Sequence, residues 1–128
     1  EKENIPPEDY AYWGTLAFGA FLTSGAEDVS IMKEAEKLLK LSVENNQNVE
    51  LASFGLVFIY TLNADKKNMD YYLSYLKNYP KSYKYMQKAI NNYEKCNDNT
   101  CAYNIITDIS QYHRSLLKKL ISNKSDTQ

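Results

Sequence analysis

The sequence is poor in residues that interrupt regular structure, because its 128 residues include only four glycines and three prolines. An all-β sandwich or barrel needs many tight turns, and this chain has too few turn-forming residues to build one. An excess of charge of one sign is also lacking, since 15 basic side chains nearly balance 16 acidic ones. A near-neutral chain gives no electrostatic reason to bind nucleic acid, and we expect none as a partner.

Residue patterns typical of enzymes and metal sites are missing as well. The sequence has no glycine-rich phosphate loop and no histidine pair, since His113 is its only histidine. Cys101 and His113 would lie about 18 Å apart along one helix, too far for a nucleophile and its base. His113 is expected at the surface beside Arg114. We therefore predict no catalytic residue, no cofactor and no metal, and we expect the protein not to be an enzyme.

Two uncharged stretches organise the chain. Residues 51–62 are apolar on every side of a helix, which indicates a central helix buried on every face. Residues 10–26 also lack charge, but they include three glycines, two threonines and a serine, so we predict a buried helix over residues 10–24 rather than a membrane span. Its small residues, including Gly14 and Gly19, would let a neighbouring helix approach closely.

Apolar spacing and capping residues predict the helices that surround these two. Asp28 is expected to cap a second helix, and Asn48 is expected to cap the central one. A further helix is predicted from about residue 69 until Pro80 ends or kinks it, because the proline ring blocks a backbone hydrogen bond. Another helix is predicted to restart at Ser82.

Regularly spaced apolar residues predict a last long helix over residues 102–120. No stretch indicates a strand. We therefore predict one all-α domain over residues 1–128, with flexible ends at 1–8 and 122–128. Its expected architecture is a compact bundle of five or six helices built from antiparallel hairpins.

A faint internal repeat relates the two uncharged helices. Phe18-Gly19 recurs as Phe54-Gly55, each pair lying in an uncharged helix that is followed by a polar turn and a charged amphipathic helix. This unit resembles tetratricopeptide-type repeats over about residues 10–80, and Pro80 matches the family's late proline. The first unit lacks that proline, its turn is longer, and no third unit follows. The resemblance implies stacked hairpins that bind protein; a plain helical bundle is the alternative.

Cys96 and Cys101 enclose four turn-forming residues, so their thiols can meet in a tight loop. We predict a disulfide between them, with two free thiols as the alternative. A disulfide indicates an oxidising compartment. Because the first residue is not methionine, we also expect a removed signal peptide and a periplasmic or secreted protein. A cytoplasmic protein with reduced cysteines is the alternative.

Tyrosine is abundant, with 12 residues in the chain and seven of them between residues 71 and 93. One helix face cannot bury them all, because Tyr71 and Tyr72 point about 100° apart. Exposed tyrosines suit protein interfaces. The candidate binding residues are Tyr71, Tyr75, Tyr79, Tyr83 and Tyr85. Two alternatives stay open: that Tyr72, Tyr75, Tyr79 and Tyr93 belong to the core, and that the tyrosine content reflects AT-rich coding.

These observations predict a small, exported, non-enzymatic helical module whose partner is another protein. A periplasmic immunity protein that occludes a toxin is one form of this function, and an accessory factor for secretion or envelope assembly is another. A cytoplasmic helical-repeat chaperone or adaptor is the first alternative. The second is a ligand-binding bundle, with a cavity lined by Trp13 and several tyrosines. The partner's identity and the oligomeric state are left open.

Overall fold

The computed structural model describes residues 4–126, and within this range it contains six α-helices and no strand. The 3-10 helix η2 (Pro7–Asp9) precedes α1, and the 3-10 helix η3 (Ser74–Asn78) continues α4. The predicted all-α class and six-helix bundle are therefore confirmed for the described part of the chain. The α-helices are α1 (Tyr10–Thr23), α2 (Val29–Glu44), α3 (Val49–Leu62), α4 (Lys66–Leu73), α5 (Pro80–Glu94) and α6 (Asn99–Asp126).

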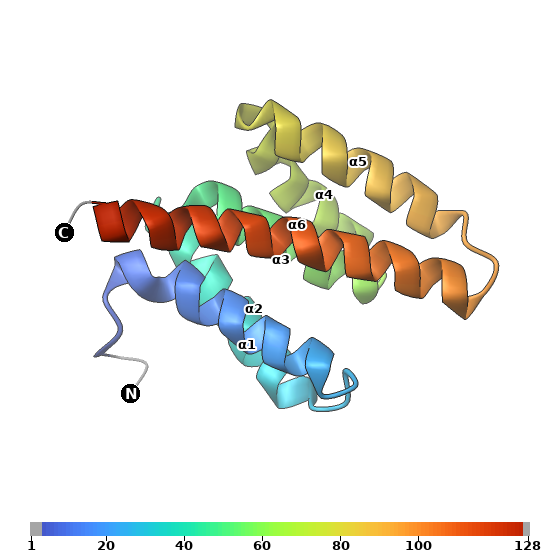
Figure 1. The fold of residues 1–128 in the computed structure, drawn as a ribbon, viewed down its shortest axis with the longest axis horizontal. Coiled ribbons are helices and arrows are strands. Elements are labelled where there is room, and N and C mark those ends of the chain that lie inside the picture. The colour runs from blue at the N-terminus through green and yellow to red at the C-terminus, as the bar shows by residue number, and fades with distance from the viewer. Residues whose placement is uncertain (1–3, 127–128) are drawn as a thin grey trace.

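Helix α3 lies at the centre of the bundle, as its apolar sequence predicts. Every residue from 51 to 61 is buried. Helix α6 lies across α3, with α1 and α2 on one side and α4 and α5 on the other (Figure 1). Because α3 contacts all five other α-helices, its residues 51–61 have no face left for water.

Consecutive helices pair as the hairpins α1–α2, α3–α4 and α5–α6. The last hairpin also turns back on the earlier part of the chain, because α6 contacts α1 as well as α3. The start of α1 and the end of α6 consequently lie at the same end of the molecule (Figure 1). Contacts between helices far apart in sequence thus close the bundle.

Glycine permits the closest helix contacts in the core. A Cβ atom on Gly14 would lie 2.8 Å from Leu39 Cδ2, and one on Gly55 would lie 2.9 Å from Leu39 Cδ1. The Leu39 side chain of α2 is therefore held between α1 and α3, where it is fully buried. The close approach predicted for Gly14 is confirmed. The same prediction is wrong for Gly19, which is exposed with nothing within 4 Å of its would-be Cβ.

Of the two predicted helix caps, one forms and one does not. Asp28 does cap α2, by accepting a hydrogen bond from Ser30 N. Asn48 does not cap α3, because it adopts a left-handed backbone (φ 48°) and its side-chain amide donates to the Glu8 carbonyl instead. Asp65 caps α4, so that helix begins earlier than residue 69.

Proline begins a helix here rather than only ending one. Pro80 is the first residue of α5, so the predicted start at Ser82 is wrong. The first amide of a helix has no intrahelical partner, and a proline at that position therefore loses no hydrogen bond. The preceding segment tightens into η3 before Tyr79, as the residue before a proline avoids helical geometry.

The chain ends predicted to be flexible fall partly outside the described residues, since 1–3 and 127–128 are not described. Of the rest, Pro7–Asp9 forms η2, and α6 continues to Asp126, beyond its predicted end at residue 120. No helix in residues 4–126 combines the length and the apolar character needed to cross a membrane.

Candidate binding surfaces

The structure distributes the five predicted binding tyrosines over separate places. Tyr71 and Tyr75 lie together on α4 and η3, with their hydroxyl oxygens 3.3 Å apart. Tyr79 lines a groove near the start of α5. Tyr83 accepts a hydrogen bond from the Gln87 amide on α5, and Tyr85 stacks on Tyr112 of α6 with ring centroids 4.3 Å apart. These tyrosines therefore do not form one continuous contact surface.

Tyr71 and Tyr75 belong to a group of four touching rings that we call the tyrosine cluster: Tyr60, Tyr71, Tyr72 and Tyr75. Its inner members, Tyr60 and Tyr72, are buried, whereas Tyr71 is 55% exposed and Tyr75 is half-buried. The Tyr72 centroid lies 4.8 Å from that of Tyr71 and 5.8 Å from that of Tyr75. The buried rings therefore support the exposed ones, which reduces the side-chain entropy that a partner would remove.

Two carboxylates, those of Glu36 and Glu44, lie near the tyrosine cluster. The Tyr60 hydroxyl donates to Glu36 on α2, which also pairs with Lys40. Burial, followed by the charges of Tyr71 and Glu44, raises the pKa of Tyr72 to about 12. The hydrogen bond with Tyr71 raises the pKa of Tyr75, to which burial and Glu44 add. The hydroxyls of Tyr72 and Tyr75 thus keep their protons at neutral pH and can donate hydrogen bonds.

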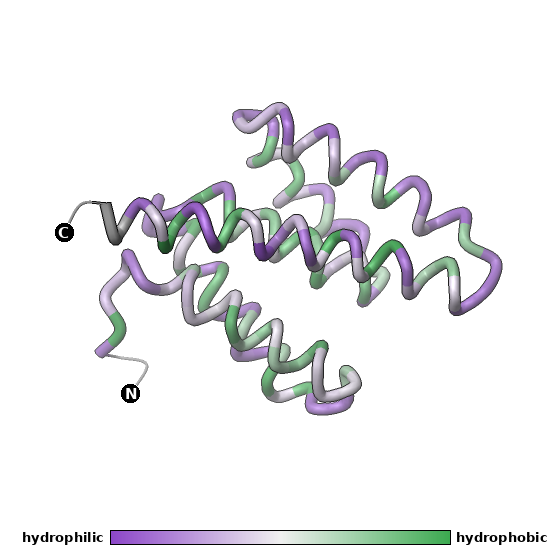
Figure 2. The backbone as a smooth tube through the Cα atoms, viewed as in Figure 1, coloured by the Kyte–Doolittle hydropathy of each residue, from purple (hydrophilic) through white to green (hydrophobic). Residues whose placement is uncertain are grey.

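Helix α1 exposes an uncharged outer face, contrary to the predicted burial of the whole helix. We call this face the α1 stripe; its members recur every three or four residues along the helix and are Trp13, Leu16, Gly19, Ala20 and Thr23. Trp13 is 48% exposed and Leu16 is 40% exposed. Along α1, Figure 2 shows apolar and neutral residues where α5 alternates with strongly hydrophilic ones. The predicted burial of residues 10–24 is therefore correct only for the inner face.

The position of α1 in the bundle explains this correction. Its neighbours α2, α3 and α6 cover the inner residues Ala11, Phe18 and Phe21, and nothing in the described chain covers the opposite side. A bundle of this size has one central position, and α3 occupies it. The sequence contains two uncharged helices, and only one of them can be central. The other must therefore expose one of its faces, which the sequence could have predicted. Trp13 consequently lies on the surface and not in an internal cavity.

A groove opens where the start of α3, the start of α5 and the last turns of α6 meet. It consists of two adjoining hollows of about 430 and 270 Å³, and four residues line both of them. These shared residues are Glu50, Tyr79, Leu116 and Lys119. We call this region the Glu50 groove. The residues that line this groove come from segments that are distant in the sequence, so no local motif predicts it.

His113 lies in the core, which corrects the surface position predicted for it. It is 4% exposed, its ring stacks on Phe54, and its imidazole hydrogen-bonds the backbone of Leu51. Burial lowers the pKa of His113 to about 4, and the bond to Leu51 opposes this shift. The spacing of the apolar residues could have predicted this buried position. His113 follows the buried Ile109 by one helical turn and precedes the buried Leu116 by another.

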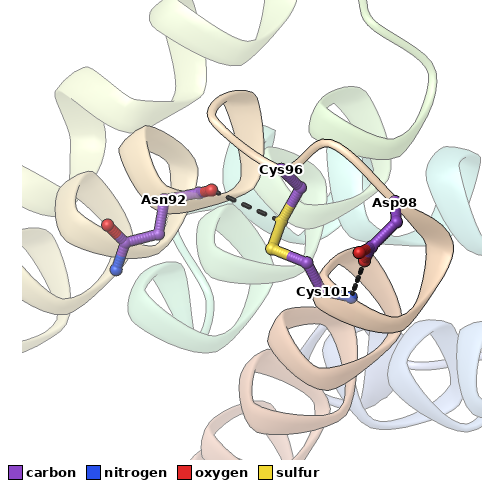
Figure 3. Close-up of a disulfide and its surroundings, with 4 residues drawn as sticks. All are labelled: Asn92, Cys96, Asp98 and Cys101. Carbon is purple, nitrogen blue, oxygen red and sulfur yellow. Dashed lines mark hydrogen bonds between the residues drawn. A yellow bond between two sulfur atoms is a disulfide. The ribbon is translucent and has the colours of Figure 1, made fainter.

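A disulfide joins Cys96, just after α5, to Cys101 in the first turn of α6 (Figure 3). The Cα atoms are 5.6 Å apart, and the Cys101 N–H donates to Asp98 at 2.8 Å, which caps the start of α6. The Cys96 sulfur lies 3.5 Å from the Asn92 carbonyl oxygen. Because a disulfide sulfur carries no proton, that approach is a van der Waals contact. The predicted disulfide is confirmed.

No group of three or more His, Cys, Asp or Glu side chains within the described part of the chain is arranged to hold a metal ion. No protein-family model, curated protein or solved structure matches the chain. Three surfaces of the described chain can contact a partner: the tyrosine cluster, the α1 stripe and the Glu50 groove.

Proposed function

We propose that this chain is a non-enzymatic helical module that binds another protein through the α1 stripe. The observation that carries the proposal is a helix without a single charge whose Trp13 and Leu16 face solvent. Tryptophan is the side chain most enriched at binding hot spots, and contiguous apolar patches on a protein surface commonly mark interaction sites. The absence of basic residues on α1 favours a protein partner over an anionic lipid surface.

The tyrosine cluster is a second contact region in this proposal. Tyr71 and Tyr75 offer aromatic area with hydroxyl groups at the edge, held by the buried Tyr72 beneath them. Of the five tyrosines predicted from sequence, these two have rings and hydroxyl groups in contact with each other, so one partner surface can contact both. Resemblance to stacked helical hairpins of the tetratricopeptide type supports the same role.

We place the protein in an oxidising compartment, the periplasm or the outside of the cell. The Cys96–Cys101 disulfide supports this placement, because cytosolic glutathione and thioredoxin keep thiols reduced. In such a compartment the protein would act as an immunity protein or as an envelope accessory factor. A cytoplasmic adaptor is the competing form. Thiol trapping in whole cells distinguishes them, because only the exported form would contain unreactive, oxidised cysteines.

The test is affinity capture from envelope and cytoplasmic fractions of the source cells, read by quantitative mass spectrometry. The bait variants are wild type, the double variant Trp13→Ala with Leu16→Ala, and the control Tyr103→Ala, which removes a side chain that is 69% exposed on α6. We expect one stoichiometric protein to bind wild type and the control, with about tenfold or greater loss on the double variant. Retention of that protein by the double variant would contradict the role of the stripe.

Trp13 also provides a direct optical test, because it is the only tryptophan in the chain. Its fluorescence emission should shift to shorter wavelength when the captured partner is added to the purified protein, since binding would remove the exposed indole from water. An unchanged emission spectrum at saturating partner would contradict the proposal. A shift that depends only on the concentration of the protein itself would instead assign the stripe to self-association, which light scattering would verify.

A further inference from the structure

A carboxylate held in one orientation lies in the Glu50 groove. Glu50 is half-buried in the first turn of α3, and Ser82 of α5 donates its hydroxyl proton to Glu50 Oε2 at 2.6 Å. The Ser82 oxygen is also 2.8 Å from the Tyr112 hydroxyl of α6. A serine has one proton to give, so the Tyr112 hydroxyl donates to Ser82, and Ser82 donates to Glu50. This relay fixes Glu50 from two other helices.

The fixed carboxylate lacks a cationic partner within the described part of the chain. The ion pairs observed there are Lys40 with Glu36 and Lys66 with Asp70, both on other surfaces. Lys119 and Lys81 are exposed residues that also line the groove, yet neither ammonium comes within ion-pair distance of Glu50. Exposed, hydrated ammonium groups weaken the attraction for a second cation only moderately. The charge of Glu50 therefore remains available to a ligand.

The remaining lining suits one long basic side chain. Tyr79, Leu116 and Leu120 form apolar walls that can contact methylene groups. Three asparagines, Asn46, Asn48 and Asn123, line the same hollow. The Asn48 amide nitrogen is committed to Glu8, so its carbonyl oxygen is left to accept hydrogen bonds. A guanidinium has five N–H donors in a plane and stacks on aromatic rings, which matches a carboxylate, amide oxygens and a tyrosine better than an ammonium does.

We propose that the Glu50 groove binds an arginine side chain presented by another protein, with the guanidinium on Glu50 and the methylene stem along Tyr79, Leu116 and Leu120. The inference goes beyond the function proposed above, because it concerns a different surface and does not depend on the α1 stripe. The protein segment that binds at this end of the bundle should therefore carry an exposed arginine.

The experiment titrates the full chain with Nα-acetyl-arginine amide and, separately, with Nα-acetyl-citrulline amide, using amide chemical shifts as the readout. Citrulline has the same shape as arginine without the charge. We expect saturable shifts centred on residues 46–51, 79–82 and 116–123 with millimolar affinity for the arginine probe, and about tenfold or weaker binding of the citrulline probe. Equal binding of both probes, shifts centred elsewhere, or no saturation at about 100 mM would overturn the proposal.

Variants test the assigned contact. Glu50→Gln should weaken binding of the arginine probe about tenfold, because the amide lacks the charge. Glu36→Gln is the matched control, since Glu36 also accepts a hydrogen bond from a hydroxyl, that of Tyr60, but lies on α2, and this variant should bind the probe like wild type. Ser82→Ala retains the charge and removes the relay, so a smaller loss is expected. Undiminished binding by Glu50→Gln would refute the site. Should that variant not fold, the comparison of the two probes on wild type decides alone.

Discussion

At the scale of single residues, the His113 imidazole links the stability of the protein to pH. It is buried against the uncharged rings of Phe54 and Phe58, and Gly55 lies directly beneath its Nε2 atom. Nε2 has no hydrogen-bond partner among the described side chains, so a proton added there would be neither solvated nor paired. Burial accordingly lowers the pKa of His113 to about 4, below its usual value of 6.5.

We predict that stability falls as the pH is lowered from 6.5 toward 4. In this range the unfolded chain binds a proton at His113 that the folded chain does not, so protonation favours unfolding. The stabilisation is fully present above pH 6.5, and the loss by pH 4 should be on the order of 3 kcal/mol. Urea unfolding at a series of pH values measures it.

The variant His113→Gln isolates this contribution, because its side chain does not titrate. The same carboxylates are present in both proteins, so the difference between the two stability curves reports His113 alone. The variant should have a flatter curve between pH 6.5 and 4. Parallel curves for the two proteins would mean that His113 is protonated equally in the folded and unfolded chains, and the burial argument would fail.

At the scale of helices, the distances between axes depend on which glycines lie inside a contact. A Cβ on Gly55 would lie 2.9 Å from Leu39 Cδ1 and 3.0 Å from His113 Nε2, and both of those side chains are buried and cannot move aside freely. We predict that Gly55→Ala destabilises the protein by about 1 to 2 kcal/mol. The overpacking strain exceeds the gain of about 1 kcal/mol in helix propensity.

Gly19 serves as the control for this prediction, since it lies in α1 with open space around it. There Gly19→Ala should stabilise the protein by up to about 1 kcal/mol, because only the helix propensity changes. Thermal or urea unfolding of both variants gives the comparison. Equal effects of the two substitutions would show that α2, α3 and α6 do not approach as closely as described.

How far the sequence predicts these helices depends on what surrounds each one. Helix α2 can be predicted from its apolar period and its Asp28 cap, and α3 from the uncharged stretch 51–62, because both signals are local. The exposed side of α1 cannot be predicted in the same way. Helices α1 and α3 both lack charge over most of their length, and only tertiary packing decides which of them becomes the central helix. The Glu50 groove is equally hidden, because Glu50, Ser82 and Tyr112 meet only after three helices assemble.

At the scale of the whole molecule, the core and the disulfide contribute to stability separately. The buried residues centre on α3, whereas the Cys96–Cys101 bond joins the exposed link between α5 and α6. A bond that spans only five positions removes little entropy from the unfolded chain, about 2 kcal/mol by the loop-closure relation. Folding of the bundle therefore should not require oxidation, and a chain of this length has enough core to fold without the cross-link.

We predict that reduction lowers the free energy of unfolding by about 2 kcal/mol and leaves the helical content unchanged. Urea unfolding with and without a phosphine reductant measures the first quantity, and far-ultraviolet circular dichroism in the absence of urea measures the second. The double variant Cys96→Ser with Cys101→Ser should match reduced wild type and should not respond to the reductant. Loss of helix on reduction would instead make the bond a condition of folding, and it would confine the folded protein to oxidising compartments. Retained helix with the expected loss of stability would mean that the chain can reach its binding-competent shape before the disulfide forms.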